Sequence, residues 1–250
     1  MQYGICPLSV IPIRSVADNA GALTSQLLYG EHFKILEQRK FWSRIRVAFD
    51  DLEGWVNNLQ ISLIDEEAYT QIEHLKNTSY AADLVSFVSG NSGALLPIIL
   101  GSTVCENKVL PHTFEGNSVN VKKEKSNLLK TALLYLNAPF LSGGRTPFGI
   151  DSSGFTQMVY KINGYALKRK ASEQSLQGDA LSFIEESEPG DLAFFDDNEG
   201  LINHVGIIMK DNYIIHAFGK VRIDRIDHTG IFNAETRSYT HSLRVIKKII

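Results

Sequence analysis

A serine and two histidines in the second half of the chain are the residues best suited to acyl-transfer chemistry. Ser152 follows Asp151 where a helix is expected to begin, and the histidines are His204 and His216. Because Asp and Ser are favoured at helix N-termini, Ser152 taken alone is explained by helix capping. A hydroxyl beside one imidazole, with a second imidazole behind it, is instead the arrangement of a nucleophile, a general base and an orienting group.

The spacing of the two histidines predicts whether their rings can meet. His204 opens an expected strand, and His216 lies near the end of the next strand, 12 residues later. If residues 210–212 form the loop, Gly206 faces His216 across the hairpin. Because residues 204 and 206 share a face, both rings then lie on one side of the sheet in diagonal contact. A two-residue loop would place the rings on opposite faces.

Other chemistries have weaker support in the sequence. It contains no HExxH motif and no histidine–carboxylate spacing typical of a metal site, so we expect neither a metal nor another cofactor. Ser152 is not part of a Gly-x-Ser-x-Gly elbow, which disfavours a serine hydrolase of that type. The two cysteines, Cys6 and Cys105, are too few for a disulfide framework and are expected to be free buried thiols.

The composition is that of an ordinary globular protein. The 250 residues have a formal net charge of −3, with 44% apolar and 21% charged residues, which disfavours disordered, collagen-like and nucleic-acid-binding proteins. No apolar run approaches the roughly 18 residues that a membrane-spanning helix needs. Residues 1–16 contain no basic segment followed by an apolar one. We therefore expect a cytoplasmic protein, or a periplasmic or extracellular one if a leader has been removed.

The elements that must position these residues fall into three parts. Residues 1–62 are expected to form a small β-barrel, because short alternating strands recur about every ten residues. Residues 63–125 are less regular and are interpreted as a second small barrel, since 96–101 repeats the run into a glycine turn at 27–30. From residue 126 the pattern changes to helices followed by antiparallel strands, which is typical of an α+β domain.

Four sequence blocks in the last part stand in a distinctive order. They are TPFGIDSSGF at 146–155, PGDLAFF at 189–195, NHVGI at 203–207 and IHA at 215–217. In order and spacing they resemble the NlpC/P60 cell-wall peptidases, and the start of the chain resembles the bacterial SH3 domains that these enzymes often contain. The resemblance implies a papain-like domain over 126–250, preceded by SH3-like barrels over 1–62 and 63–125.

The resemblance also implies roles for individual residues. Ser152 stands at the nucleophile position of a Cys-His-His site, with His204 as the general base and His216 as the orienting residue. The implied substrate is a murein peptide or peptidoglycan fragment, cleaved between γ-D-Glu and a diamino acid. The implied substrate-binding residues are Asp151, Ser153, Arg169 and Leu52.

The pocket departs from the family pattern at several positions. Ser152 replaces the family's cysteine, and an alcohol is far less acidic than a thiol, whose pKa is about 8.5. Several other positions around the same pocket also differ from the family pattern, and changes at several positions favour natural loss of activity over an engineered Cys-to-Ser substitution. The other departures are Leu52 for a tyrosine, Ser142 for a tryptophan, Lys170 and Ala171 for Asp and Ser, and Gly21 and Ala22 where an acidic residue is usual.

Three functions remain open at this point. The first is a murein-peptide endopeptidase that is weak or inactive because of Ser152. The second is a pseudoenzyme that binds a cell-wall peptide without cutting it. The third is a scaffold whose SH3-like domains bind a protein partner. The sequence predicts no oligomeric state.

Overall fold

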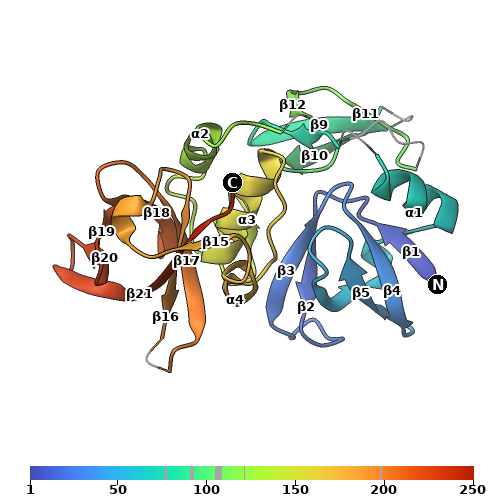
Figure 1. Cartoon of the computed structure of the whole chain (residues 1–250). Coiled ribbons are helices and arrows are strands. Elements are labelled where there is room, and N and C mark those ends of the chain that lie inside the picture. Colours follow the sequence, from blue (N-terminus) through green and yellow to red (C-terminus); the bar gives the residue numbers. More distant parts are fainter. Residues whose placement is uncertain (76–77, 91–92, 105–108, 121, 198) are drawn as a thin grey trace. The chain divides into compact units, whose positions relative to one another are not determined.

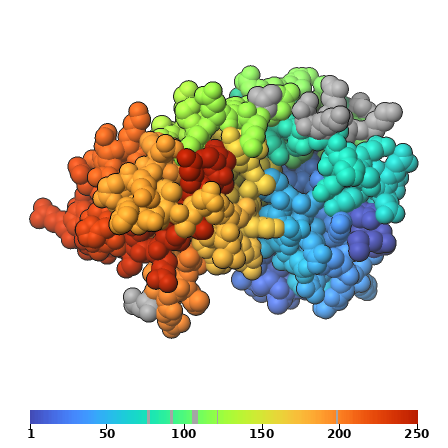
Figure 2. All heavy atoms as spheres, viewed as in Figure 1, coloured from blue at the N-terminus to red at the C-terminus, as the bar shows by residue number. Residues whose placement is uncertain are grey.

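The computed structural model describes residues 1–75, 78–90, 93–104, 109–120, 122–197 and 199–250. The chain separates into two compact units (Figure 1). The first unit comprises Met1–Val121 with Ser142–Thr146, and the second comprises Lys122–Leu141 with Pro147–Ile250. In Figure 2 the blue and cyan atoms belong to the first unit and the orange and red atoms to the second.

The first unit begins with a seven-stranded antiparallel sheet, in the order β3-β2-β6-β5-β4-β1-β7. Apolar and polar side chains alternate along the strands, so that Ile11, Ile13, Ile45 and Val47 all enter one core, which Leu52 also joins. The expected short strands at the start of the chain are therefore present, and the sheet extends to residue 64. The strands are β1 (Gln2–Ile5), β2 (Val10–Arg14), β3 (Leu23–Leu28), β4 (His32–Gln38), β5 (Trp42–Val47), β6 (Glu53–Asn57) and β7 (Ser62–Ile64), with the short helix η1 (Asn58–Gln60) between the last two.

The middle of the chain packs against this sheet within the first unit. A second core contains Ile5 and Tyr29 together with Ile72, Val88 and Ile98. Strands β10-β9-β11 form one sheet and β12-β8 another. A second SH3-like barrel over 63–125 stays a prediction, and Cys105 lies outside the described residues. The elements are α1 (Glu66–Glu73), β8 (Tyr80–Ala81), β9 (Val85–Gly90), β10 (Leu95–Ile99), β11 (His112–Phe114) and β12 (Ser118–Val119).

A short segment from later in the chain also belongs to the first unit. Arg145 is buried, and its two terminal nitrogens donate to the two carboxylate oxygens of Glu31 at 2.8 and 2.9 Å. The backbone N–H of Arg145 donates to Oε1 of Gln26 at 2.7 Å. These bonds explain why residues 142–146 join this unit. The predicted domain limits, which are 1–62, 63–125 and 126–250, rest on sequence pattern and stay predictions.

The second unit has several helices beside a large antiparallel sheet. The central helix, α3, is buried along its whole length and packs against β17 and β18, while α2 packs against α3. The apolar residues of α3 lie at the expected helical spacing; they are Phe155, Met158, Val159 and Ile162. The helices are α2 (Asn127–Leu133), α3 (Ser152–Ile162), α4 (Ala171–Gln174) and the short η2 (Ile184–Glu186). Two two-residue strands precede α3 in the chain: β13 (Arg145–Thr146), which belongs to the first unit, and β14 (Gly149–Ile150), which belongs to the second.

The sheet of the second unit has the order β15-β21-β16-β17-β18-β19-β20. Because β20 also pairs with β21, the six strands from β21 to β20 form a closed ring of pairings. Helices followed by antiparallel strands confirm the expected α+β class. Within the described residues, no helix is long and apolar enough to cross a membrane. The strands are β15 (Asp179–Leu181), β16 (Leu192–Asp196), β17 (Ile202–Ile208), β18 (Tyr213–Phe218), β19 (Lys220–Ile226), β20 (Gly230–Asn233) and β21 (Ser238–Lys248).

Candidate active site

The β17–β18 hairpin brings His204 and His216 together. Its register pairs Gly206 with His216, as the three-residue loop predicts. Met209 donates its backbone N–H to Tyr213 and closes the turn at 2.8 Å. The two rings meet on one face, with His204 Nε2 and His216 Nδ1 2.8 Å apart. A general base and its orienting residue must lie within hydrogen-bonding distance of each other, and these two rings do.

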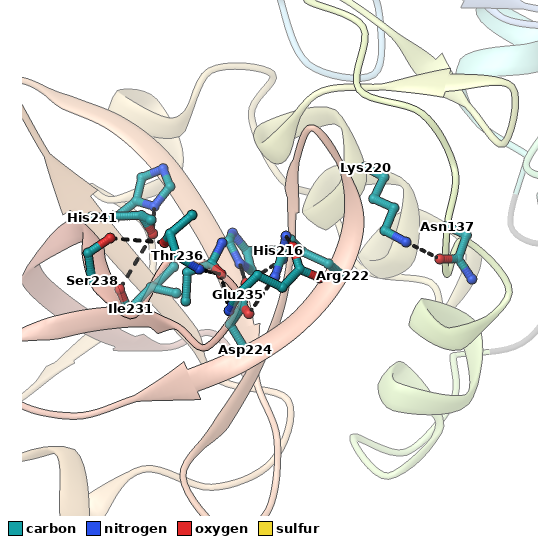
Figure 3. Close-up of polar contacts among 12 residues, drawn as sticks. Asn137, His216, Lys220, Arg222, Asp224, Ile231, Glu235, Thr236, Ser238 and His241 are labelled. Carbon is teal, nitrogen blue, oxygen red and sulfur yellow. Dashed lines mark hydrogen bonds and ion pairs between the residues drawn. The ribbon is translucent and has the colours of Figure 1, made fainter.

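A third strand continues this row of hydrogen bonds. Nε2 of His216 lies 3.0 Å from Oδ2 of Asp224, on β19 (Figure 3). Arg222 donates from Nε and Nη2 to the two oxygens of the same carboxylate, at 2.6 and 2.9 Å, and Glu235 accepts from Nη1 of Arg222. Because Asp224 accepts at His216 Nε2, that nitrogen holds the proton, and His216 Nδ1 accepts the proton of His204 Nε2. Asp224 thus fixes the tautomer of the whole row.

Burial keeps these imidazoles neutral. It lowers the pKa of His204 well below the ordinary value of 6.5, and the nearby His216 and His241 lower it further. Burial also lowers the pKa of His216, although the hydrogen bond and charge of Asp224 oppose the change. Burial raises the pKa of Asp224, but the bonds from His216 and Arg222 outweigh it and hold that pKa below 3.8. A neutral imidazole beside an ionised carboxylate is suited to accept a proton.

His241, on β21, lies against the same row. Its ring stacks on His204 with centroids 3.9 Å apart and an interplanar angle of 23°. Its Nδ1 lies 2.8 Å from the hydroxyl oxygen of the neighbouring Thr240. Burial lowers the pKa of His241 to about 4, and His216 contributes to this effect. Three imidazoles therefore cluster where sequence reasoning expected two.

The start of α3 holds the other predicted residues of this unit. Asp151 is the N-cap, and its Oδ1 accepts the backbone N–H of Gly154 at 2.7 Å. Arg169 donates to both oxygens of Asp151, at 2.9 and 2.7 Å, and to the hydroxyl oxygen of Ser153 at 2.9 Å. Ser152 is the first residue of α3 and is 5% exposed. The helix N-terminus favours negative charge near its first residues, which helps a hydroxyl there to lose its proton.

The structure thus gathers the predicted residues into two groups. His204 and His216 contact each other, and Asp151, Ser153 and Arg169 form a separate hydrogen-bonded cluster. Ser152 begins the helix that packs against β17 and β18. Leu52 lies in the hydrophobic core of the first unit. The roles assigned to all these residues stay predictions.

Sequence reasoning missed Asp224 and His241. Asp224 could have been found by extending the hairpin argument by one strand, because Arg222 pairs with His216 and residue 224 shares its face. His241 is 25 residues beyond His216, and it reaches the row only because β21 joins the closed sheet. The alternation of β19 was therefore a usable signal, whereas no local pattern indicated His241.

Comparison with known proteins agrees with this architecture. The model of the NlpC/P60 family matches residues 137–240, and the model of the bacterial dipeptidyl-peptidase SH3 domain matches residues 13–61. The gamma-D-glutamyl-L-lysine dipeptidyl-peptidase of Bacillus subtilis (strain 168) is 32% identical over 223 residues, which cover 78% of this chain and 72% of that protein. A similarly named Bacillus cereus protein is 26% identical over 80% of this chain and 68% of its own length.

A solved structure shares the fold. The crystal structure of an NlpC/P60 family protein from Bacillus cereus has a TM-score of 0.82 with this chain, at 17% identity, and 99% of each chain is covered. Together, the sheet, the buried central helix and the SH3-like strands define an α+β, papain-like peptidase domain that follows an SH3-like domain. The chain belongs to the NlpC/P60 family.

Proposed function

We infer that this chain is a murein-peptide hydrolase of the NlpC/P60 type, which cleaves between γ-D-Glu and a diamino acid. The observation that best supports the proposal is the buried row of His204, His216 and Asp224, hydrogen-bonded at 2.8 and 3.0 Å. Peptide binding alone does not require a neutral, oriented imidazole, whereas proton transfer does. The names of the relatives supply the substrate class.

In the proposed reaction, the hydroxyl oxygen of Ser152 attacks the carbonyl carbon of the γ-D-Glu linkage. His204 accepts the hydroxyl proton and passes it to the departing amine of the diamino acid, while His216 and Asp224 hold the imidazolium. Water then attacks the ester on Ser152 and gives a proton to His204, which passes it to the departing Ser152 oxygen as the acid is released. Each step forms and breaks one bond at the carbonyl carbon and returns His204 to its neutral form.

The proposed reaction is slow because the nucleophile is an alcohol. A thiol close to an imidazole ionises readily, whereas the alcohol must lose its proton as it attacks. We expect a rate about two to four decades below that of a cysteine at this position, or about 3–5 kcal/mol of barrier at 1.4 kcal/mol per decade.

The proposed substrate-binding residues of the second unit lie at the start of α3 and beside it. Here Asp151, Ser153 and Arg169 are hydrogen-bonded together. We assign Asp151 and Ser153 to the peptide's amino terminus and main chain, with Arg169 fixing the orientation of both. The role that the resemblance implies for Leu52, which lies in the core of the first unit, stays a prediction.

The test uses L-Ala-γ-D-Glu-L-Lys and its diaminopimelate counterpart as substrates. The chain should release L-Ala-γ-D-Glu slowly, and His204→Ala should lower that release by about 10²-fold or more, the usual contribution of a general base. His228→Ala, which removes an exposed histidine of the same unit, is the matched control and should keep the rate. Equal release by both variants would show that the activity does not come from this site.

A second candidate is a pseudoenzyme that binds the same peptides. Ser152 in place of the family's cysteine favours it. Saturable binding in calorimetry, without any dipeptide release, would establish this alternative. If neither peptide binding nor dipeptide release is observed, both proposals are contradicted and the scaffold function remains.

A further inference from the structure

Three histidines from three strands converge in the second unit. His204, His216 and His241 lie on β17, β18 and β21, and each offers a ring nitrogen that lies within 4.8 Å of the other two. His204 and His216 are buried, and His241 is partly exposed. The plane of the His216 ring is nearly perpendicular to the planes of the other two rings, at interplanar angles of 88° and 85°.

In two of these rings, one ring nitrogen is already hydrogen-bonded to an oxygen atom outside the cluster. Nε2 of His216 is bonded to the Asp224 carboxylate at 3.0 Å, and Nδ1 of His241 lies 2.8 Å from the Thr240 hydroxyl. Arg222 in turn holds the carboxylate in place. Histidines that bind metals typically donate their second N–H to a carboxylate or another oxygen, which fixes the ring and its tautomer.

We propose that His204 Nε2, His216 Nδ1 and His241 Nε2 bind a divalent transition-metal ion of the Zn²⁺ type. Neutral imidazoles suit Zn²⁺, and three of them leave a fourth position open for water or another ligand. At Zn–N distances of about 2.0–2.1 Å, tetrahedral ligand atoms lie about 3.3 Å apart, so the widest pair must approach by about 1.5 Å.

Metal binding replaces the hydrogen bond between His204 and His216. The proton on His204 Nε2 moves to Nδ1 of the same ring, so that Nε2 gains a free lone pair and no net proton is lost. His216 keeps its proton on Nε2, bonded to Asp224. The metal then occupies the nitrogen that links His204 to its orienting residue, so metal binding and the proposed hydrolysis are mutually exclusive at this site.

The experiment measures metal binding directly, without substrate. The full chain, freed of metal with EDTA, is titrated with Co²⁺, whose visible d–d absorption reports tetrahedral coordination, and with Zn²⁺ by calorimetry. We expect one ion per chain. His241→Phe keeps a stacked ring but removes a ligand, and should weaken binding by about 100-fold or more, at least the cost of losing an outer-shell partner. His228→Ala is the control and should bind as the unmodified chain does.

Two further variants keep the test decisive if His241→Phe unfolds. Asp224→Asn and Thr240→Val leave all three ligands in place and each should weaken binding by about 10- to 100-fold. Absence of the Co²⁺ absorption in the unmodified chain, or equal binding by His241→Phe and His228→Ala, would overturn the proposal. Because no peptide is present, failure of the proposed hydrolysis would not affect this result, and failure of metal binding would leave the hydrolase proposal intact.

Discussion

The start of α3 and the histidine row on the sheet are both buried and polar, but their hydrogen bonds are organised differently. At the helix start, Arg169 and Asp151 are joined as an ion pair that also includes Ser153. On the sheet, neutral rings are linked in a line that ends at one carboxylate, Asp224. The first cluster fixes a local structure, whereas the second can take up and pass on a proton. Substitution of Arg169 should therefore change mainly the stability, and substitution of Asp224 mainly the reaction rate.

Ser152→Cys should have the largest effect, because it changes only the proposed nucleophile. We expect dipeptide release to rise by about 10²- to 10⁴-fold, or about 3–5 kcal/mol. The measurement is the release of L-Ala-γ-D-Glu under reducing conditions. Ser182→Cys adds an exposed thiol to the same unit and should leave the rate unchanged. A silent Ser152→Cys variant would contradict the proposal that residue 152 is the nucleophile of this site.

Arg169→Met tests the structural character of the helix start. It leaves the Asp151 carboxylate without its buried partner, and we expect a loss of about 3 kcal/mol in the free energy of unfolding. Urea titration measures this. Arg244→Met is the control, because Arg244 is 64% exposed and lies 3.7 Å from Asp196, so its loss should cost no more than about 0.5 kcal/mol. Equal losses for both variants would contradict a structural ion pair at α3.

Asp224→Asn tests whether the sheet cluster acts as a relay. In the Ser152→Cys background and with EDTA present, we expect kcat/KM to fall by about 10- to 100-fold, less than the roughly 10²- to 10⁴-fold contribution of a general base itself, because Asp224 only orients His216. The amide can present either a donor or an acceptor to His216 Nε2, so it does not fix the tautomer as the carboxylate does. Glu235→Gln removes the outer, 74% exposed partner of Arg222 and should change the rate less than twofold, about 0.4 kcal/mol. Similar rates for the two variants would contradict the relay.

The smallest expected effect is on the pH dependence of stability. Burial lowers the pKa of His241 from 6.5 to about 4 in the folded chain. Below pH 6.5 the unfolded chain therefore binds the proton first, and stability falls until the pH reaches the folded pKa. His241→Phe should remove about 1–2 kcal/mol of this loss, after allowing for partial exposure.

Urea titrations at pH 7 and pH 4.5, in EDTA, measure that difference. His228→Ala should lose stability with falling pH as the unmodified chain does. A His241→Phe chain with the same pH dependence as the control would show that His241 is not desolvated in the folded state.

The sequence by itself determined the local arrangement of the site. Loop length fixed the hairpin register, and the period of two then placed His204 and His216 on one face. The apolar spacing after Asp151 likewise determined α3. Both depend on residues close together in the chain, where hydrogen-bond geometry leaves few alternatives.

Only the tertiary structure decided which residues join the site from a distance. His241 reaches His204 because β21 pairs with both β16 and β20, and strand order is set by packing of the whole sheet. Arg145 similarly binds Glu31, 114 residues away in the sequence. Such contacts depend on long-range burial of side chains, which leaves no periodic pattern in the sequence around either partner.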